Sequence, residues 1–154
     1  MPIFRKATED DIILIEEMFL SEVEPNKEHA EQFAYDLVKH LNTILCLEDQ
    51  KICGTISWDR RGGWDDGVVE IIGLGVNEEY RRRGFASVLV KDAIAHAKSV
   101  FAEKGEILRR VFLFMESENK TARQFYESIG FEEKASIANF YPHADASIFL
   151  LEVK

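Results

Sequence analysis

A nearly continuous apolar run, Val68–Val76, limits the folds open to this chain more than any other stretch. Such runs are typical of central strands that are buried on both faces. An apolar stripe at helical spacing follows between Ala86 and Ala97, and a second short apolar strand follows at Val111–Met115. A buried strand, a helix and another strand in succession predict an α/β domain built around a central sheet.

The other elements complete the order β-α-α-β-β-β-α-β-α-β-β, a mixed α/β (α+β) domain with four helices and a central mixed sheet of six to seven strands. Further strands are expected at Ile3–Lys6, Thr43–Leu47, Lys51–Trp58, Phe131–Phe140 and Ser147–Val153. Further helices are expected from a capping box at Thr8 and Asp11 to the break at Pro25, over the stripe Ala30, Phe33, Leu37 and Leu41, and between Asn119 and Gly130. No repeat or linker divides the 154 residues, so we expect a single domain spanning 1–154.

The chain is acidic, with a formal net charge of −9, which argues against a general nucleic-acid binder. Cys46 and Cys53 lie in apolar strand-like runs without a C-x-x-C pattern, which favours buried free thiols over a disulfide. No cluster of His, Cys and Asp has metal-ligand spacing, so no metal site is expected. No apolar segment has the length of a signal peptide core or a membrane span, which predicts a cytoplasmic protein without a membrane partner.

The one concentration of positive charge, Arg81-Arg82-Arg83, stands between the buried strand and the following helix and runs directly into Gly84. A helix N-terminus offers unpaired N–H groups and the positive end of the helix dipole. Gly84 lets the backbone approach a ligand closely, and arginines add charge-assisted hydrogen bonds. The segment therefore predicts a phosphate or pyrophosphate site, with a solvated basic turn as the alternative. It matches neither the G-x-G-x-x-G dinucleotide fingerprint nor a P-loop.

Three motifs in register resemble one family. Arg81-x-x-Gly84-x-Ala86 fits the [Q/R]-x-x-G-x-[G/A] signature of the GNAT superfamily, the acyl-CoA-dependent N-acetyltransferases. The strand Glu70–Val76 precedes it at the family's spacing, and Asn119-x-x-Ala122-x-x-Phe125-Tyr126-x-x-x-Gly130-Phe131 is similar to the family's closing motif. The order of elements resembles the GNAT fold over nearly the whole chain.

The resemblance implies acetyl-CoA as co-substrate. The pyrophosphate would lie against the turn, and the pantetheine arm would pair with the strand backbone near Leu74, Gly75 and Val76, as an added strand does. The residues implied in this way for the turn and the closing motif are Arg81, Arg82, Arg83, Gly84, Phe85, Ala86, Ser87, Asn119 and Tyr126.

Acetyl transfer to an amine requires removal of a proton from the amine and a donor for the departing thiolate. Tyr126 stands at the family's thiolate-facing position and is the candidate acid, with a core aromatic as the alternative. Glu70 is the candidate base, because it is a lone carboxylate in an apolar strand and resembles the glutamate of the histone acetyltransferase branch. The alternative is a structural glutamate at a solvated strand start, with Glu116 or water managing the proton.

Near the C-terminus, Asn139-Phe140-Tyr141-Pro142 and Asp145-Ala146 are similar to a pattern of protein N-terminal acetyltransferases, including those that act on ribosomal protein alanine. Phe140 and Tyr141 would then flank the acceptor. One departure stands out: that branch carries a glutamate base where this chain has Phe114, and Glu116 follows two residues on. Glu24 and Glu28, near the junction of the first two helices, are further candidates for attracting a cationic amine, with a solvated acidic face as the alternative.

The sequence thus predicts an N-acetyltransferase that uses acetyl-CoA and acts on a primary amine by direct attack in a ternary complex. A protein or peptide N-terminus or a lysine is the expected acceptor. A small polyamine-like amine and a non-catalytic acyl-CoA-binding regulatory protein remain as alternatives. The sequence leaves a homodimer open.

Overall fold

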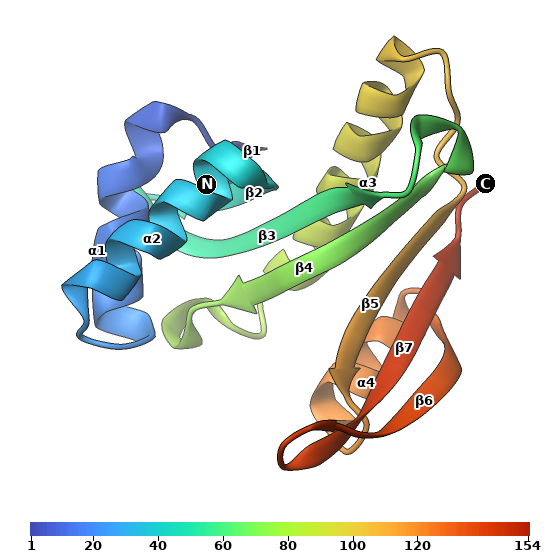
Figure 1. The fold of residues 1–154 in the computed structure, drawn as a ribbon. Coiled ribbons are helices and arrows are strands. Elements are labelled where there is room, and N and C mark those ends of the chain that lie inside the picture. The colour runs from blue at the N-terminus through green and yellow to red at the C-terminus, as the bar shows by residue number, and fades with distance from the viewer. The chain divides into compact units, whose positions relative to one another are not determined.

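The computed structural model describes all residues from 1 to 154 (Figure 1). The strands and helices in chain order are β1 (Ile3–Lys6), α1 (Ile12–Glu22), α2 (Lys27–Tyr35), β2 (Asn42–Glu48), β3 (Lys51–Arg61), β4 (Val68–Val76), α3 (Phe85–Glu103), β5 (Arg110–Glu116), α4 (Lys120–Ser128), β6 (Glu132–Tyr141) and β7 (Ala144–Glu152). One seven-stranded mixed sheet has the order β1-β2-β3-β4-β5-β7-β6. The predicted fold class and element order are confirmed. None of the helices is both long and apolar enough to cross a membrane.

Most predicted boundaries agree with the structure within a few residues, and the bounds of β4 are those predicted. Three segments differ, one of which is β7, since it begins at Ala144, three residues before the predicted Ser147. β3 continues to Arg61, three residues beyond Trp58, so the two arginines expected in the loop belong to the strand. The second helix ends in a π-helical turn, Asp36–His40, rather than continuing as an α-helix to Leu41.

The chain divides into two compact units, which are described separately. Unit 1 comprises Met1–Asp59 and Ile72–His96. In it, α1 and α2 lie side by side (Figure 1) and pack on β2 and β3 through a core that includes Ile15, Ala34, Leu45 and Ile52. Tight pairing of β3 with β4 depends on Gly54, since a Cβ there would lie 2.7 Å from the Gly75 carbonyl oxygen.

Within unit 1, Cys46 and Cys53 are free and fully buried, as predicted. Burial raises the pKa of the Cys46 thiol to about 12 and also raises the pKa of Cys53. Because the thiolate is the reactive form, neither cysteine is a candidate nucleophile.

Unit 2 comprises Arg60–Ile71 and Ala97–Lys154. In this unit, the first residues of β4 pair in parallel with β5. β5 pairs antiparallel with β7, and β7 pairs antiparallel with the edge strand β6. α4 covers one face of these strands, where the Arg123 guanidinium lies over the Phe149 ring at 5.2 Å. Trp64 anchors the loop between β3 and β4, because its ring packs against the Phe101 ring with centroids 5.0 Å apart. Trp64 therefore has a structural role at the tip of this hairpin.

Candidate active site

The arginine-rich turn joins β4 to α3 and lies entirely in unit 1. Its backbone enters the left-handed region at Arg82 (φ 66°) and Gly84 (φ 79°). A Cβ built on Gly84 would meet no atom within 4 Å, so the space in front of the turn is open. Turns of this kind direct successive N–H groups to one side, and the first N–H groups of α3 add to them. The turn therefore has the geometry of an anion cradle.

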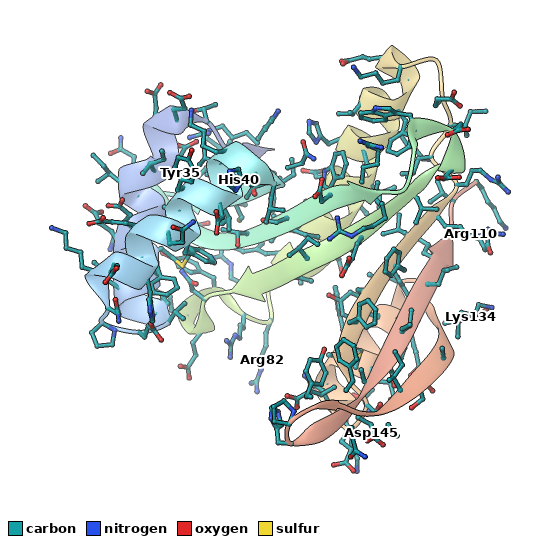
Figure 2. The ribbon with its side chains drawn as sticks, in the orientation of Figure 1. Tyr35, His40, Arg82, Arg110, Lys134 and Asp145 are labelled. Atoms are coloured by element: carbon teal, nitrogen blue, oxygen red, sulfur yellow. The ribbon has the colours of Figure 1, made fainter.

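The three arginine side chains of the turn have different surroundings. Arg81 donates from Nε to the carbonyl oxygen of Val76 at 2.9 Å. Arg83 donates through both terminal nitrogens to the Glu48 carboxylate, at 2.9 and 2.8 Å. Arg82 has no protein partner, and Figure 2 shows its side chain extending away from the ribbon. Arg82 is therefore the one arginine of the turn whose whole guanidinium is without a protein partner, whereas Arg81 keeps its two terminal nitrogens unbonded.

Next to the turn, Ile72–Val76 of β4 forms an edge of unit 1, since the ladder from β4 to β5 covers only Val68–Glu70. Positions 73 and 75 are exposed glycines, and a Cβ at either would meet nothing within 4 Å. A groove of about 550 Å³ in unit 1 lies along this strand. Its lining includes Glu22, Asp36, Leu74, Val76, Glu78 and Arg81. An exposed strand edge of this kind can hydrogen-bond an extended amide chain.

In unit 2, Glu70 lies on β4 directly opposite Phe112 of β5. Its carboxylate accepts a hydrogen bond from Arg61 Nε at 2.8 Å, and the side chain is 17% exposed. The ion pair fixes the position of this carboxylate on the sheet and offsets its charge. Arg61, which sequence reasoning did not associate with the site, thus competes with any ligand for Glu70.

β5 carries aromatic residues on one face and buried aliphatic residues on the other. Val111, Leu113 and Met115 are buried, whereas Phe112, Phe114 and Glu116 alternate with them and lie on the opposite face. The Phe114 ring stacks on Phe140 with centroids 5.3 Å apart and an interplanar angle of 9°. Phe140 in turn contacts the Tyr141 ring at 5.1 Å. We call the set Phe112, Phe114, Phe140 and Tyr141 the aromatic surface.

Phe140 and Tyr141 reach this surface because β6 is irregular before its end. Asn139 has φ 55°, a conformation that asparagine tolerates better than most residues, and its N–H donates to Asp145 Oδ1 at 2.8 Å. The Asn and Asp of the sequence pattern therefore have a structural role in the turn between β6 and β7.

The aromatic surface ends in a hydrogen-bonded pair, with His143 Nε2 and Glu116 Oε1 2.6 Å apart. Glu116 lies on the same face as Phe114, as the strand alternation predicts. The pair places a carboxylate and an imidazole beside exposed aromatic rings, a setting that can hold an ammonium group through charge and cation–π attraction.

Tyr126 of α4 is 8% exposed and packs against Phe125 and Phe131, with ring centroids 5.0 and 5.4 Å away. Burial raises the pKa of its phenol to about 12, so the hydroxyl carries its proton at neutral pH. No protein group hydrogen-bonds to this hydroxyl, and it is not sealed from solvent. A neutral donor without a protein partner is thus present where the family motif places the acid.

The remaining candidates have local roles in the structure. Asn119 caps α4, since its side-chain oxygen accepts from the Ala122 N–H at 3.0 Å. Glu24 is hydrogen-bonded to His29, and Glu28 is exposed in the first turn of α2. Neither Glu24 nor Glu28 lines the groove along β4, where Glu22 does. Acceptor contacts by Glu24 and Glu28 and a coenzyme contact by Asn119 stay predictions.

The sequence profile of the Acetyltransferase (GNAT) family matches residues 10–131. The chain belongs to the GNAT acetyltransferase family. A mycothiol acetyltransferase of Corynebacterium diphtheriae is 32% identical over 93 residues, which are 58% of this chain and 28% of that protein. The chain spans between 27% and 42% of the length of the curated relatives it matches.

Solved structures confirm the GNAT fold over the full chain. The ribosomal-protein-S18-alanine N-acetyltransferase of Escherichia coli has a TM-score of 0.77 at 18% identity, covering 100% of this chain and 95% of that one. Arabidopsis thaliana NAA60, in complex with a bisubstrate analogue, has a TM-score of 0.78 at 19% identity, covering 100% and 99%. At these identities the likeness concerns the fold.

GNAT acetyltransferases use acetyl-CoA as a co-substrate, and NAA60 has also been solved in complex with it. The chemistry of unit 1 fits such a ligand. The turn at Arg82 and Gly84 offers N–H groups and one unpaired guanidinium for a pyrophosphate. The exposed edge Ile72–Val76 offers backbone groups to an arm that contains amides.

Proposed function

We propose that this GNAT acetyltransferase transfers the acetyl group from acetyl-CoA to the α-amino group of a peptide or protein by direct attack in a ternary complex. The observation that carries the proposal is the aromatic surface ending in the pair of Glu116 and His143. An N-terminal residue has an ammonium group beside a side chain. The pair suits the ammonium group, and the stacked rings of Phe114 and Phe140 suit the side chain.

The likeness to NAA60 and to the ribosomal-protein-S18-alanine acetyltransferase supports the same class of acceptor, since both share the fold around this surface. No activated cysteine is available for an acetyl-enzyme, because both thiols are buried with raised pKa values. Direct attack by the amine is therefore the simpler route.

Glu70 lies opposite Phe112, four residues before Glu116 on β5. In the proposed reaction, the ammonium group therefore leaves the pair of Glu116 and His143, moves along the aromatic surface to Glu70 and gives a proton to that carboxylate, directly or through one water. The neutral nitrogen attacks the thioester carbonyl carbon, and the C–S bond breaks as the C–N bond is completed. The nitrogen then gives its second proton, through water, to the departing thiolate, which leaves as the thiol of coenzyme A. The Tyr126 hydroxyl donates a hydrogen bond to the departing sulfur.

Glu70→Gln is expected to lower kcat/KM about tenfold to a hundredfold at pH 6–7, with a deficit that narrows toward pH 9. An α-amino group has a pKa of about 8, so the acceptor is mostly protonated at low pH and needs a base most there. The measurement is kcat/KM against pH for one good peptide. The matched variant Glu116→Gln tests the other carboxylate on this face. A deficit of Glu70→Gln that does not change with pH would make Glu70 structural.

A panel of acceptors tests the substrate class. A peptide with a free N-terminus and no lysine is expected to be acetylated at least tenfold faster than an N-terminally blocked peptide with lysine or a linear polyamine, scored by mass shift. Preference for lysine or the polyamine would contradict the α-amino proposal. Retained acetyl-CoA binding without turnover on any acceptor would favour a regulatory protein.

Truncation of a side chain of the aromatic surface is expected to weaken binding of the acceptor and to leave binding of acetyl-CoA unchanged. Phe140→Ala is expected to raise the KM of the good peptide about tenfold, as loss of an aromatic contact does, with the KM of acetyl-CoA unchanged. Ile107→Ala, an apolar truncation at a residue that is 77% exposed in unit 2, is the control. Equal effects of the two truncations would remove the aromatic surface from acceptor binding.

A further inference from the structure

The turn that carries Gly84 is tied to the far end of β2 by a single side-chain pair within unit 1. Both terminal nitrogens of Arg83 bond to the two carboxylate oxygens of Glu48, at 2.9 and 2.8 Å. This two-bond geometry is the strongest and most directional form of an arginine–carboxylate contact. The Arg83 guanidinium also lies 4.7 Å over the Phe85 ring, which is buried and meets Phe4 edge-on at 5.8 Å. Arg83 is thus held on two sides.

Glu48 is a firm anchor for this contact. It is the last residue of β2, which is paired with β1 on one side and β3 on the other. Its side chain is only 18% exposed, whereas that of Arg83 is 45% exposed. The hydrogen bond from Arg83 lowers the pKa of the Glu48 carboxyl, so it is charged at any pH where the enzyme would work.

The neighbouring residue explains why the turn needs an anchor. Arg82 has φ 66°, a left-handed conformation that is unfavourable for a residue with a Cβ. Such conformations persist only where the surroundings fix them. On one side, Arg81 donates to the Val76 carbonyl oxygen. On the other side, Arg83 donates to the Glu48 carboxylate. These two contacts anchor the chain on both sides of Arg82.

We propose that Glu48 is a positioning residue for coenzyme A, which acts by holding Arg83 and so keeps the turn in its phosphate-binding form, while Arg82 is the arginine that contacts the phosphate. The proposal concerns the co-substrate and is independent of the acceptor. It divides a run of three identical residues into one ligand contact, Arg82, and two structural contacts, Arg81 and Arg83.

The rival arrangement is that Arg83 leaves Glu48 and binds the phosphate itself. The two arrangements predict opposite signs for one substitution. If Arg83 bound the phosphate, Glu48→Gln would remove a negative charge near an anionic ligand and release Arg83, and affinity would rise. If Glu48 positions the turn, the same substitution loosens it, and affinity falls although the local charge has become more favourable.

The test is calorimetric titration with coenzyme A at one fixed ionic strength, because salt screens exposed charges. Glu48→Gln is expected to weaken binding about tenfold, the equivalent of about 1.4 kcal/mol of lost preorganisation. The control is Glu79→Gln, which removes the same charge from an exposed glutamate of the adjacent turn that forms no ion pair. It should leave the affinity unchanged or slightly higher. Thermal unfolding of each variant checks that unit 1 is intact.

Arg83→Gln should weaken binding about as much as Glu48→Gln, and the double variant should be no weaker than either single one, because the two residues act as one contact. At saturating acetyl-CoA, Glu48→Gln should retain kcat with a raised KM, a separation that general destabilisation would not produce. Arg82→Gln should weaken binding on its own. Unchanged or tighter binding by Glu48→Gln overturns the proposal, as does a full additional loss from Arg83→Gln in that background.

Discussion

Glutamate in place of Gly84 is expected to weaken acetyl-CoA binding at least about a hundredfold, which corresponds to roughly 2.7 kcal/mol of binding free energy. The direction in which a side chain would leave Gly84 is open, with no atom within 4 Å of a Cβ. A glutamate there would fill the space in front of the N–H groups of the turn and add a negative charge at an anion site. Calorimetric titration with acetyl-CoA measures the loss.

The variant also carries backbone strain, because Gly84 has φ 79°. Gly105 offers a matched control, with φ 72° and no atom within 4 Å of its Cβ, at a site outside the turn. Gly105→Glu should show the same small loss of thermal stability and normal affinity. If Gly84→Glu stays folded and binds acetyl-CoA normally, the turn is not the pyrophosphate site, and the role assigned to Glu48 fails with it.

The position of this turn was predictable from the sequence because its signals are local. The apolar run Val68–Val76, the glycine at 84 and the helical stripe that follows are each read within a few residues, and the structure places β4 and α3 accordingly. The same holds for the cap at Asn119 and the free thiols of Cys46 and Cys53.

The partners of the site residues could not be predicted in this way. The sequence treats Arg81, Arg82 and Arg83 alike, whereas the structure gives Arg83 a partner, Glu48, that lies 35 residues away in the chain. The contact between His143 and Glu116 spans 27 residues. Pairs of this kind depend on strand register and on which strands are neighbours, and neither is encoded in a local pattern.

Glu70 illustrates the consequence for chemistry. As a lone carboxylate in an apolar strand, it looks like a desolvated base. Its partner Arg61 is only nine residues away, but it belongs to the end of β3, which extends three residues further than the sequence predicts. The ion pair of Glu70 could not be predicted, because it depends on β3 ending at Arg61 rather than at Trp58.

Tyr126→Phe is expected to lower kcat about 10²- to 10³-fold with little change in the affinity for acetyl-CoA. Burial raises the pKa of the Tyr126 phenol to about 12, whereas an ordinary thiol has a pKa of about 8.5. Complete transfer of the phenolic proton to the thiolate would be uphill by about 3.5 pKa units, or about 5 kcal/mol. We therefore expect Tyr126 to donate a hydrogen bond to the sulfur in the transition state and to keep its proton.

Tyr126→Phe is expected to change the rate of acetyl transfer without changing the stability of the protein. The phenylalanine ring keeps the contacts to Phe125 and Phe131, and the hydroxyl has no protein partner to lose, so thermal stability should stay within about 0.5 kcal/mol of the wild type. Tyr35→Phe removes a hydroxyl from an exposed tyrosine of unit 1 and is the control for activity. Because the donor acts only as charge develops on sulfur, single-turnover rates should fall as much as kcat. A Tyr126→Phe enzyme with wild-type single-turnover rates would leave Tyr126 as a core aromatic residue and assign the thiolate to another donor.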